Sequence, residues 1–299
     1  MKMQKQCSRG WRTAVSVALC MVFFQANQVL AQPQEPDYQG VVFATVGDKT
    51  LALDIYLPNA SENPPLLVWV HGGAWRSGDK TDVPSVFVEN GFATASVNYR
   101  LSPEARFPAQ VHDIKAAIRF LRARGEEYGF STDRIAIAGS SAGAHLAALV
   151  GVTNGHSGLE GTVGGNLDES SDVQAILSYF GASNLTTILT QSTPHGLSVR
   201  KPALDLFLGG QPDAVPDIAK LASPVFHVDA GDPPLLLLHG DQDPQMPINQ
   251  SHELEGIYQR HGLDVSLDVV HGAAHGGPDF YEGNHLINAL DFLERTIRN

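Results

Sequence analysis

Short apolar segments alternate with helix-like segments along this chain from residue 66 onward, and this rhythm limits the folds that it can adopt. Each apolar segment is continuous, which is typical of strands that are covered on both faces. The segments are 66–70, 92–97, 134–138, 175–180, 235–238 and 265–270. Strands that are separated by helices favour an α/β fold, with a mostly parallel sheet and helices on both of its faces.

Helical periodicity fills most of the stretches between these strands, and a hairpin signal precedes the first of them. The predicted helices are 84–89, 110–127, 142–150, 250–260 and 286–297. Residues 41–46 and 51–57 alternate apolar and polar side chains on either side of Gly47 and Asp48, which predicts an antiparallel hairpin. The expected fold is therefore one α/β domain that begins with this hairpin.

Two segments interrupt the rhythm and carry only weak helical signals. They are 153–172, which is rich in Gly, Ser and Asn, and 182–232, in which we expect short helices over 202–208 and 216–221. Ligands of open α/β sheets bind outside the carboxyl ends of the strands, where the following loops surround them. We expect the two segments to form the rim of a substrate site, with a small lid or none.

The first 31 residues have the pattern of a secretory signal peptide. Four basic residues precede an apolar run over 14–24, and Val29-Leu30-Ala31 ends the segment. The apolar run is about half as long as a membrane-spanning helix. We expect cleavage near Ala31, a secreted or periplasmic protein, a short linker over 32–40 and a catalytic domain over 41–299.

Cleavage would leave an acidic chain without cysteine. Sixteen Lys and Arg would face 32 Asp and Glu, a formal charge of −16, and both Cys7 and Cys20 would be removed. Such a charge argues against nucleic acid or an anionic membrane as a partner, so we expect neither. We also expect no metal and no cofactor, because no metal-binding or nucleotide-binding motif occurs.

His112, His145 and His239 are expected to be structural, and the sequence does not indicate the oligomeric state.

The motif Gly139-Ser140-Ser141-Ala142-Gly143 lies between the predicted strand 134–138 and the predicted helix 142–150. A serine in a sharp strand-to-helix turn is the arrangement of a nucleophile elbow. The flanking glycines allow the strand and the helix to approach without a Cβ clash, and Ser140 is expected to be a turn residue. Ser141 is therefore the predicted nucleophile.

A serine nucleophile needs a base, and the base needs a carboxylate that orients it. His275 lies in a glycine-flanked loop after the last predicted strand, and His271, closer to that strand, is the competing candidate. The acid should follow the preceding strand, where Asp243 lies further from the strand end than its competitor Asp241. We predict Ser141, Asp243 and His275, which have the chain order of an α/β-hydrolase triad.

A negatively charged tetrahedral intermediate needs hydrogen-bond donors that are already in place. The segment His71-Gly72-Gly73-Ala74-Trp75 directly follows the predicted strand 66–70. Its glycines leave backbone N–H groups unobstructed. We therefore predict that Gly72 and Gly73 form an oxyanion hole together with the N–H of Ala142.

These residues together resemble a known family. The shared motifs are 71–80, 98–102, 107–110 with Asp113, 139–143, Ser223-Pro224, 239–247 and His275-Gly276. They are similar to those of the secreted α/β-hydrolase esterases called bifunctional feruloyl/acetyl-xylan esterases, within the hormone-sensitive-lipase-like carboxylesterases that carry an H-G-G-x-W loop. The likeness runs from about residue 41 to the end of the chain and implies the α/β-hydrolase fold.

The resemblance also implies roles for further residues. Trp75 would bind substrate, on the acyl or alcohol side of the pocket. Three residues would be structural pairs beneath the oxyanion loop: Tyr99, Arg100 and Asp113. Two positions depart from the family pattern, because Ala74 replaces the usual third glycine and Asn184 stands where the family carries an aspartate.

From these features we expect a secreted serine carboxylic ester hydrolase that works through an acyl-enzyme. Its expected substrate is a small ester or an acylated polysaccharide, and acetyl or feruloyl groups on plant cell-wall polysaccharide are the first choice. The alternatives are a generic short-chain carboxylesterase, an arylformamidase or peptidase of the same fold, and an inactive hydrolase fold used for adhesion. An inactive relative would lack a triad member, and none is missing here.

Overall fold

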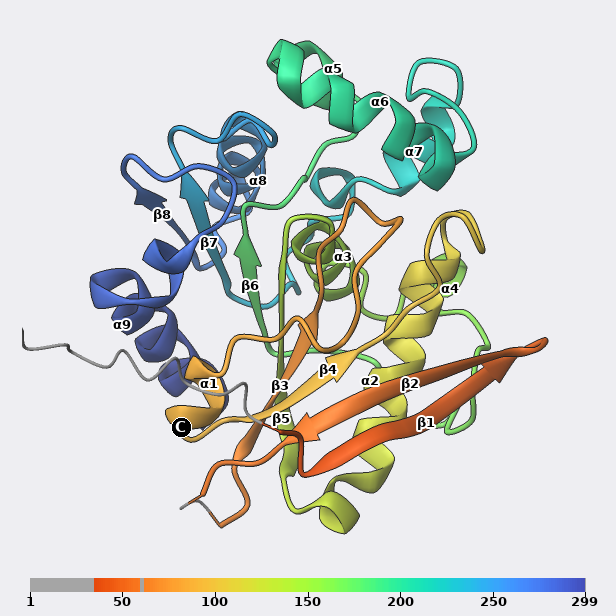
Figure 1. Ribbon diagram of the computed structural model, residues 1–299, viewed down its shortest axis with the longest axis vertical. Helices are drawn as coiled ribbons and strands as arrows, with labels where there is room; N and C mark the ends of the chain where they lie inside the picture. The colour runs from red at the N-terminus through yellow and green to blue at the C-terminus, as the bar shows by residue number, and fades with distance from the viewer. Residues whose placement is uncertain (1–34, 60–61, 299) are drawn as a thin grey trace, which may run out of the picture. The chain divides into compact units, whose positions relative to one another are not determined.

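The structure is a computed structural model that describes residues 35–59 and 62–298 (Figure 1). The predicted signal peptide, its cleavage position near Ala31 and the first residues of the predicted linker lie outside the described residues. The first described strand begins at Tyr38, so the end of the expected linker 32–40 is already part of the sheet.

The described residues form an eight-stranded sheet in the order β1-β2-β4-β3-β5-β6-β7-β8. The strands are β1 (Tyr38–Val46), β2 (Lys49–Tyr56), β3 (Pro65–Val70), β4 (Ala93–Val97), β5 (Ser131–Ser140), β6 (Ala175–Tyr179), β7 (Leu235–Gly240) and β8 (Val265–Val270). β1 and β2 form the predicted hairpin, β2 pairs antiparallel with β4, and the other neighbours are parallel. This confirms the expected sheet.

Helices cover both faces of the sheet (Figure 1). They are α1 (Val86–Glu89), α2 (Ala109–Tyr128), α3 (Ala142–Gly151), α4 (Ser157–Glu160), α5 (Ile188–Gln191), α6 (Pro194–Leu208), α7 (Pro216–Leu221), α8 (Asn249–Arg260) and α9 (Gly283–Leu293), with short turns η1 (Pro224–Phe226), η2 (Pro278–Tyr281) and η3 (Glu294–Arg298). Side chains of α2, α3 and α8 share a core with one face, and those of α1 and α9 with the other. In the described part of the chain, no helix combines the length and apolarity needed to cross a bilayer.

Strand β3 shows why these strands are apolar without alternation. Leu66, Val68 and Val70 face one core, whereas Leu67 and Trp69 face the other. None of the five side chains is more than 2% exposed. Because both faces of the strand are covered, every position is selected for an apolar side chain.

The segment between β6 and β7 carries α5, α6 and α7, which lie beyond the carboxyl ends of the parallel strands (Figure 1). The prediction of a short helix over 202–208 is wrong in length, because α6 begins at Pro194 and continues through Pro202. The Thr193 side chain accepts a hydrogen bond from the N–H of Gly196 at 3.0 Å and caps this helix. Proline is common at the first helical position, so both Pro194 and Pro202 are compatible with a helix start. The Thr193 cap shows that the helix starts at Pro194.

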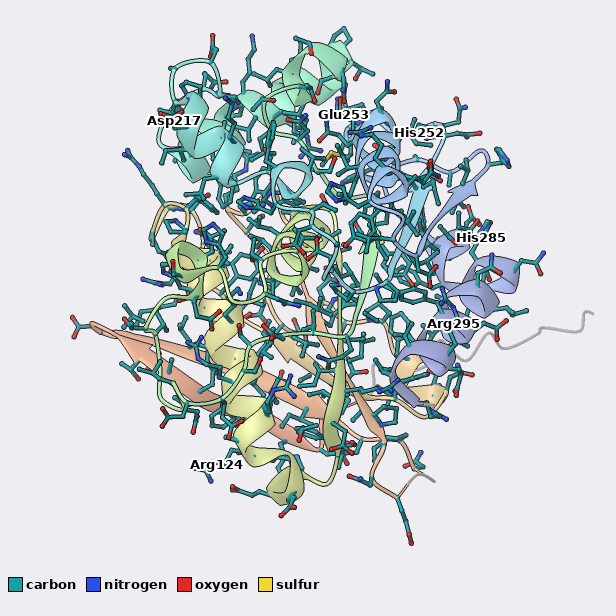
Figure 2. All side chains as sticks on the ribbon, turned by 180° about the vertical axis from the view of Figure 1, so that it is seen from behind. Arg124, Asp217, His252, Glu253, His285 and Arg295 are labelled. Carbon is teal, nitrogen blue, oxygen red and sulfur yellow. The ribbon has the colours of Figure 1, made fainter. Side chains whose placement is uncertain are left out.

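Polar contacts hold this segment to α8. Glu253 of α8 lies next to α5 (Figure 2) and accepts a hydrogen bond from the side chain of Gln191 at 2.5 Å. The buried Gln250 accepts hydrogen bonds from the backbone N–H groups of Ser183 and Asn184 at 2.9 and 2.8 Å. The departure from the family pattern at Asn184 leaves this anchor intact, because the backbone makes the contact.

The turn from β5 into α3 is packed against the end of β3. A Cβ atom on Gly143 would lie 2.0 Å from the carbonyl oxygen of Val70, and one on Gly139 would lie 2.6 Å from the same atom. Backbone atoms cannot yield as a flexible side chain does, so glycine is required at both positions. The predicted reason for the two glycines, a close approach of strand and helix, is confirmed.

We predict that Gly143→Ala destabilises the fold by about 3 kcal/mol or more, because the new methyl group would overlap backbone atoms of β3. Urea unfolding followed by circular dichroism measures the loss. Gly165→Ala is the matched control, since a Cβ atom there would meet no atom within 4 Å. Equal stability of the two variants would contradict the proposed contact.

Candidate active site

Ser141 lies between β5 and α3 in a strained backbone conformation. Its φ of +54° and ψ of −115° are unusual for a residue with a Cβ atom. Two hydrogen bonds hold the turn: the N–H of Ser141 donates to the carbonyl of Tyr179 at 2.8 Å, and its carbonyl accepts from the N–H of His145 at 3.1 Å. The fold therefore stabilises the strained serine from both sides.

A chain of hydrogen bonds joins Ser141, His275 and Asp243, which follow three different strands. Ser141 Oγ lies 2.8 Å from His275 Nε2, and His275 Nδ1 lies 2.6 Å from Asp243 Oδ2. A carboxylate can only accept, so Nδ1 carries the ring proton and Nε2 is free to accept the serine proton. The structure thus brings the three predicted residues together in an arrangement that permits base-assisted nucleophilic attack.

The side chain of Asp243 is fully buried, and donors surround its carboxylate. Oδ1 accepts hydrogen bonds from the N–H groups of Gln245 and Met246, each at 2.8 Å, and Oδ2 lies 3.5 Å from Nε2 of His239. Burial raises the pKa of Asp243, but contacts with His239, His275 and the backbone outweigh it and hold that pKa below its ordinary value. The carboxylate therefore stays ionised and can orient the histidine.

The competing candidates His271 and Asp241 pair with each other instead. His271 Nδ1 lies 2.8 Å from Asp241 Oδ2, and 83% of the His271 side chain is exposed. The N–H of Gly272 also donates to Asp241 at 2.8 Å. Within residues 62–298 neither candidate is hydrogen-bonded to Ser141, so the structure favours His275 and Asp243.

The loop that follows β3 lies beside the serine. A Cβ atom on Gly72 would lie 3.0 Å from the carbonyl of Ser140 and 3.5 Å from the Cβ of Ser141, so a larger residue would crowd the turn. Among the described residues, the N–H groups of Gly72 and Gly73 donate no hydrogen bond. Ala142 begins α3, where the first N–H groups have no acceptor within the helix. Within the described part of the chain, the three predicted amides are therefore free of backbone acceptors, and Gly72 lies against the turn that carries the nucleophile.

Side chains beneath this loop fix its backbone. The ring of Tyr99 stacks on His71 with centroids 4.5 Å apart, and its hydroxyl donates to the His71 carbonyl at 3.1 Å. Arg100 makes a bidentate ion pair with Asp113 over distances of 2.7 to 3.1 Å. Ala74, in place of the usual glycine, has a φ of +53°, a conformation that favours glycine. The structure places Tyr99 against the loop, as the resemblance implies, and it pairs Arg100 with Asp113 without a hydrogen bond to the loop among the described residues.

Trp75 does not line an open pocket, which corrects the expected substrate-binding role. Its side chain is 0% exposed and stacks on Phe207 of α6 with ring centroids 4.7 Å apart. Its Nε1–H donates to Nδ1 of His145 at 3.1 Å. The indole packs α6 against α3. A tryptophan beside a glycine-rich loop gives the same sequence signal whether it packs or binds substrate.

His145 is a buried, neutral histidine one turn after the nucleophile. Its Nε2 donates to the carbonyl of Ala222 at 2.7 Å, and its Nδ1 accepts from Trp75. Burial lowers the pKa of His145 to about 4, and the nearby charge of Arg200 acts in the same direction. This environment is that of a structural histidine, as expected.

Two buried side chains that the sequence analysis did not single out shape the same region. They are Gln250, which anchors the segment before α5, and Arg200 on α6, which is 1% exposed. Arg200 stands at helical spacing from the buried Gly196 and Phe207. A cation on an otherwise apolar helix face is therefore the sequence feature that could have identified it. Among residues 35–59 and 62–298, no group of three His, Cys, Asp or Glu side chains is placed to hold a metal ion.

The sequence model of the BD-FAE family matches residues 53–257. The chain belongs to the BD-FAE family. The matched range includes the glycine loop, Ser141 and Asp243, and it ends before His275.

Curated relatives and solved structures support the same placement. Esterase LipQ of Mycobacterium tuberculosis is 36% identical over 219 residues, which are 71% of this chain and 50% of LipQ. The chain spans about half the length of the curated relatives it matches.

A truncated form of a carbohydrate esterase from gut microbiota has a TM-score of 0.79 and 32% identity, covering 88% of this chain and 98% of that chain. A bifunctional GH43-CE from Bacteroides eggerthii has a TM-score of 0.74 and 35% identity, over 82% of this chain and 33% of that chain. The resemblance to α/β-hydrolase esterases and the expected fold are thereby confirmed.

This BD-FAE member should lose stability through His145 as the pH falls from 6.5 to 4. The unfolded chain protonates this ring near its ordinary pKa of 6.5, whereas the folded chain does so only near 4, so acid favours the unfolded state. Above the unfolded pKa of 6.5, neutral His145 contributes about 3 kcal/mol to the free energy of unfolding. Most of this contribution is lost by pH 4. Urea midpoints measured across this range should show the fall.

His145→Gln tests the assignment, because glutamine can donate and accept but does not titrate in this range. The variant should show a smaller decrease of its midpoint on acidification than the wild type. His252→Gln is the control, since that ring is 55% exposed. Parallel pH profiles for all three proteins would argue that other groups account for the loss.

Proposed function

We propose that this chain hydrolyses carboxylic esters through an acyl-enzyme intermediate. The observation that carries the proposal is the unbroken hydrogen-bond chain from Ser141 through His275 to Asp243. The esterase and carbohydrate esterase relatives support the same class of reaction. A catalytically inactive fold is disfavoured, since the geometry for attack is complete.

In the first step, the Ser141 hydroxyl oxygen bonds to the ester carbonyl carbon, and its proton passes to Nε2 of His275. The resulting imidazolium keeps its Nδ1–H on Asp243, whose negative charge stabilises it. The low pKa of Asp243 keeps that proton on the ring rather than on the carboxylate.

The carbonyl oxygen becomes an oxyanion in this step. We propose that it accepts hydrogen bonds from the N–H groups of Gly72, Gly73 and Ala142, of which the last also lies at the positive end of the α3 dipole. Each such donor typically contributes about 10²- to 10³-fold in turnover.

The tetrahedral intermediate then expels the alcohol, which takes the proton from His275 and leaves an acylated Ser141. Water attacks the acyl group, gives its proton to the same imidazole and releases the carboxylic acid. The Ser141 oxygen recovers its proton as the acyl bond breaks. No cofactor enters this balance.

We infer that the substrates are acetyl esters, and also feruloyl esters, of plant cell-wall polysaccharide. The likeness to the gut carbohydrate esterase, over 98% of its truncated chain, supports a saccharide on the alcohol side. We further propose that the protein is exported to the periplasm or outside the cell after cleavage near Ala31. Its acidic composition supports a soluble enzyme that acts without nucleic acid or membrane partners.

Ser141→Ala should abolish the release of p-nitrophenol from p-nitrophenyl acetate. Asp243→Asn should lower kcat by about 10⁴-fold, because the amide cannot hold the histidine in the required tautomer. Asp241→Asn and His271→Gln alter the neighbouring surface pair and should retain wild-type turnover. Full activity of Ser141→Ala would refute the mechanism, and a collapse in Asp241→Asn would assign the acid to that residue.

The acyl specificity can be measured with a chain-length series of p-nitrophenyl esters, run beside acetic acid release from acetylated xylan. We expect the highest kcat/KM on the acetyl ester together with release from the polymer, because the proposed substrate is an acetylated polysaccharide. A preference for long acyl chains without polymer release would indicate a generic carboxylesterase.

The alternative functions, formamide and peptide hydrolysis, can be tested on this protein in parallel. N-formylkynurenine and an aminoacyl p-nitroanilide should be poor substrates beside p-nitrophenyl acetate. A faster rate on either compound would assign the site to a formamidase or a peptidase.

A further inference from the structure

Arg200 on α6 is a buried cation whose side chain forms no salt bridge and no hydrogen bond among the described residues. Its side chain is 1% exposed, and its Nε and Nη2 atoms are fully buried and donate no hydrogen bond. Burial of an unpaired guanidinium is costly, so folded proteins rarely contain one. The contrast within this chain is Arg119, which is equally buried and is paired with Glu160. Arg119 thus meets a carboxylate and keeps only its Nε without a partner, whereas Arg200 forms no salt bridge within the described part of the chain.

Helix α6 places Arg200 beside the candidate active site. Gly196, one turn earlier on the same face, lies so close to the loop after Asp243 that a Cβ atom would come within 3.0 Å of a backbone oxygen there. Phe207, about two turns later, stacks on Trp75. Along α6, Arg200 therefore stands between the residue that meets the loop after Asp243 and the residue that stacks on the Trp75 indole.

The guanidinium remains charged, and the acid does not use its donors. Burial lowers the pKa of Arg200 to about 10 while the charge of Asp243 acts in the opposite direction, so the group is protonated at neutral pH. The Asp243 oxygens are already engaged by His275, Gln245 and Met246. Only Nε and Nη2 are fully buried without a partner, which leaves Nη1 at the solvent-facing edge of the side chain.

We propose that Arg200 binds a carboxylate on the substrate, so that the site selects esters that carry a negative charge close to the bond that is cleaved. A charged guanidinium forms strong hydrogen bonds with a carboxylate, and Nη1, at the edge of the Arg200 side chain, is the donor atom that a substrate would meet first. The inference rests on the proposed ester hydrolysis. The carboxylate can belong to the acyl part, as in a half-ester of a dicarboxylic acid, or to the alcohol part, as in an ester on a saccharide that carries a uronic acid.

The test compares kcat/KM for charged and neutral members of matched ester pairs. Ethyl hydrogen succinate and its neutral amide, ethyl succinamate, form the acyl arm, with ethanol release as the readout. Acetylated xylo-oligosaccharides with and without a uronic acid form the alcohol arm, with acetate release as the readout. The wild type should prefer the charged member in at least one arm, by roughly 10- to 100-fold. The arm that shows the preference identifies where the carboxylate lies.

Arg200→Met should bring that ratio close to unity, whereas Lys201→Met, which removes the exposed cation next to it, should leave the ratio unchanged. The ratio corrects for any general damage to the neighbouring triad. If Arg200→Met does not fold, Arg200→Lys should reduce the ratio, because lysine keeps the charge but lacks the paired donors.

Three results would overturn the inference: no charge preference in either arm, a preference that survives in the Arg200 variants, or a preference that Lys201→Met removes as strongly. Hydrolysis of p-nitrophenyl acetate by the wild type separates this inference from the proposed function. An enzyme that cleaves that ester without any charge preference contradicts only the role of Arg200. An enzyme that cleaves none of the esters contradicts the proposed function itself.

Discussion

The direct backbone contact between the β5–α3 turn and the end of β3 is the constraint on which the site depends. Gly143 lies against the carbonyl of Val70, and Gly72 lies against the turn that holds Ser141. Because main chain touches main chain, the nucleophile and the glycine-loop amides belong to one rigid unit and do not depend on flexible side chains. The parallel strands β7 and β8 end at the same edge of the sheet and deliver Asp243 and His275 to this unit.

The strands and the triad could be predicted from the sequence because their signals are local. A strand covered on both faces is apolar at every position, as β3 shows, and so it can be recognised without knowledge of its neighbours. Ser141, Asp243 and His275 each follow such a strand, and parallel strands bring their carboxyl ends together. Local patterns and the topology of the sheet were therefore sufficient to predict that the three side chains meet.

The features that were not predictable are set by contacts between distant segments. Both Pro194 and Pro202 are compatible with a helix start, and the cap from Thr193 selects the first. Trp75 was assigned to substrate binding because its sequence neighbours are those of a pocket, yet Phe207 covers it from α6. Since contacts of α6 with Trp75 and with the loop after Asp243 set its position, no periodicity in the sequence could place Arg200 beside the acid.

The surroundings of the nucleophile keep His145 neutral and Asp243 ionised, so that the only proton that moves is the one exchanged between Ser141 and His275. His145 lies within one turn of Ser141, and a charge on its ring would oppose the formation of an imidazolium on His275. Burial lowers the pKa of His145 and keeps its ring neutral, and its two nitrogens are satisfied by an indole N–H and a backbone carbonyl. The ionised Asp243 supports the imidazolium, while Arg200 adds a fixed positive charge that a substrate carboxylate would offset. In this arrangement His275 is the group left free to accept and return the serine proton.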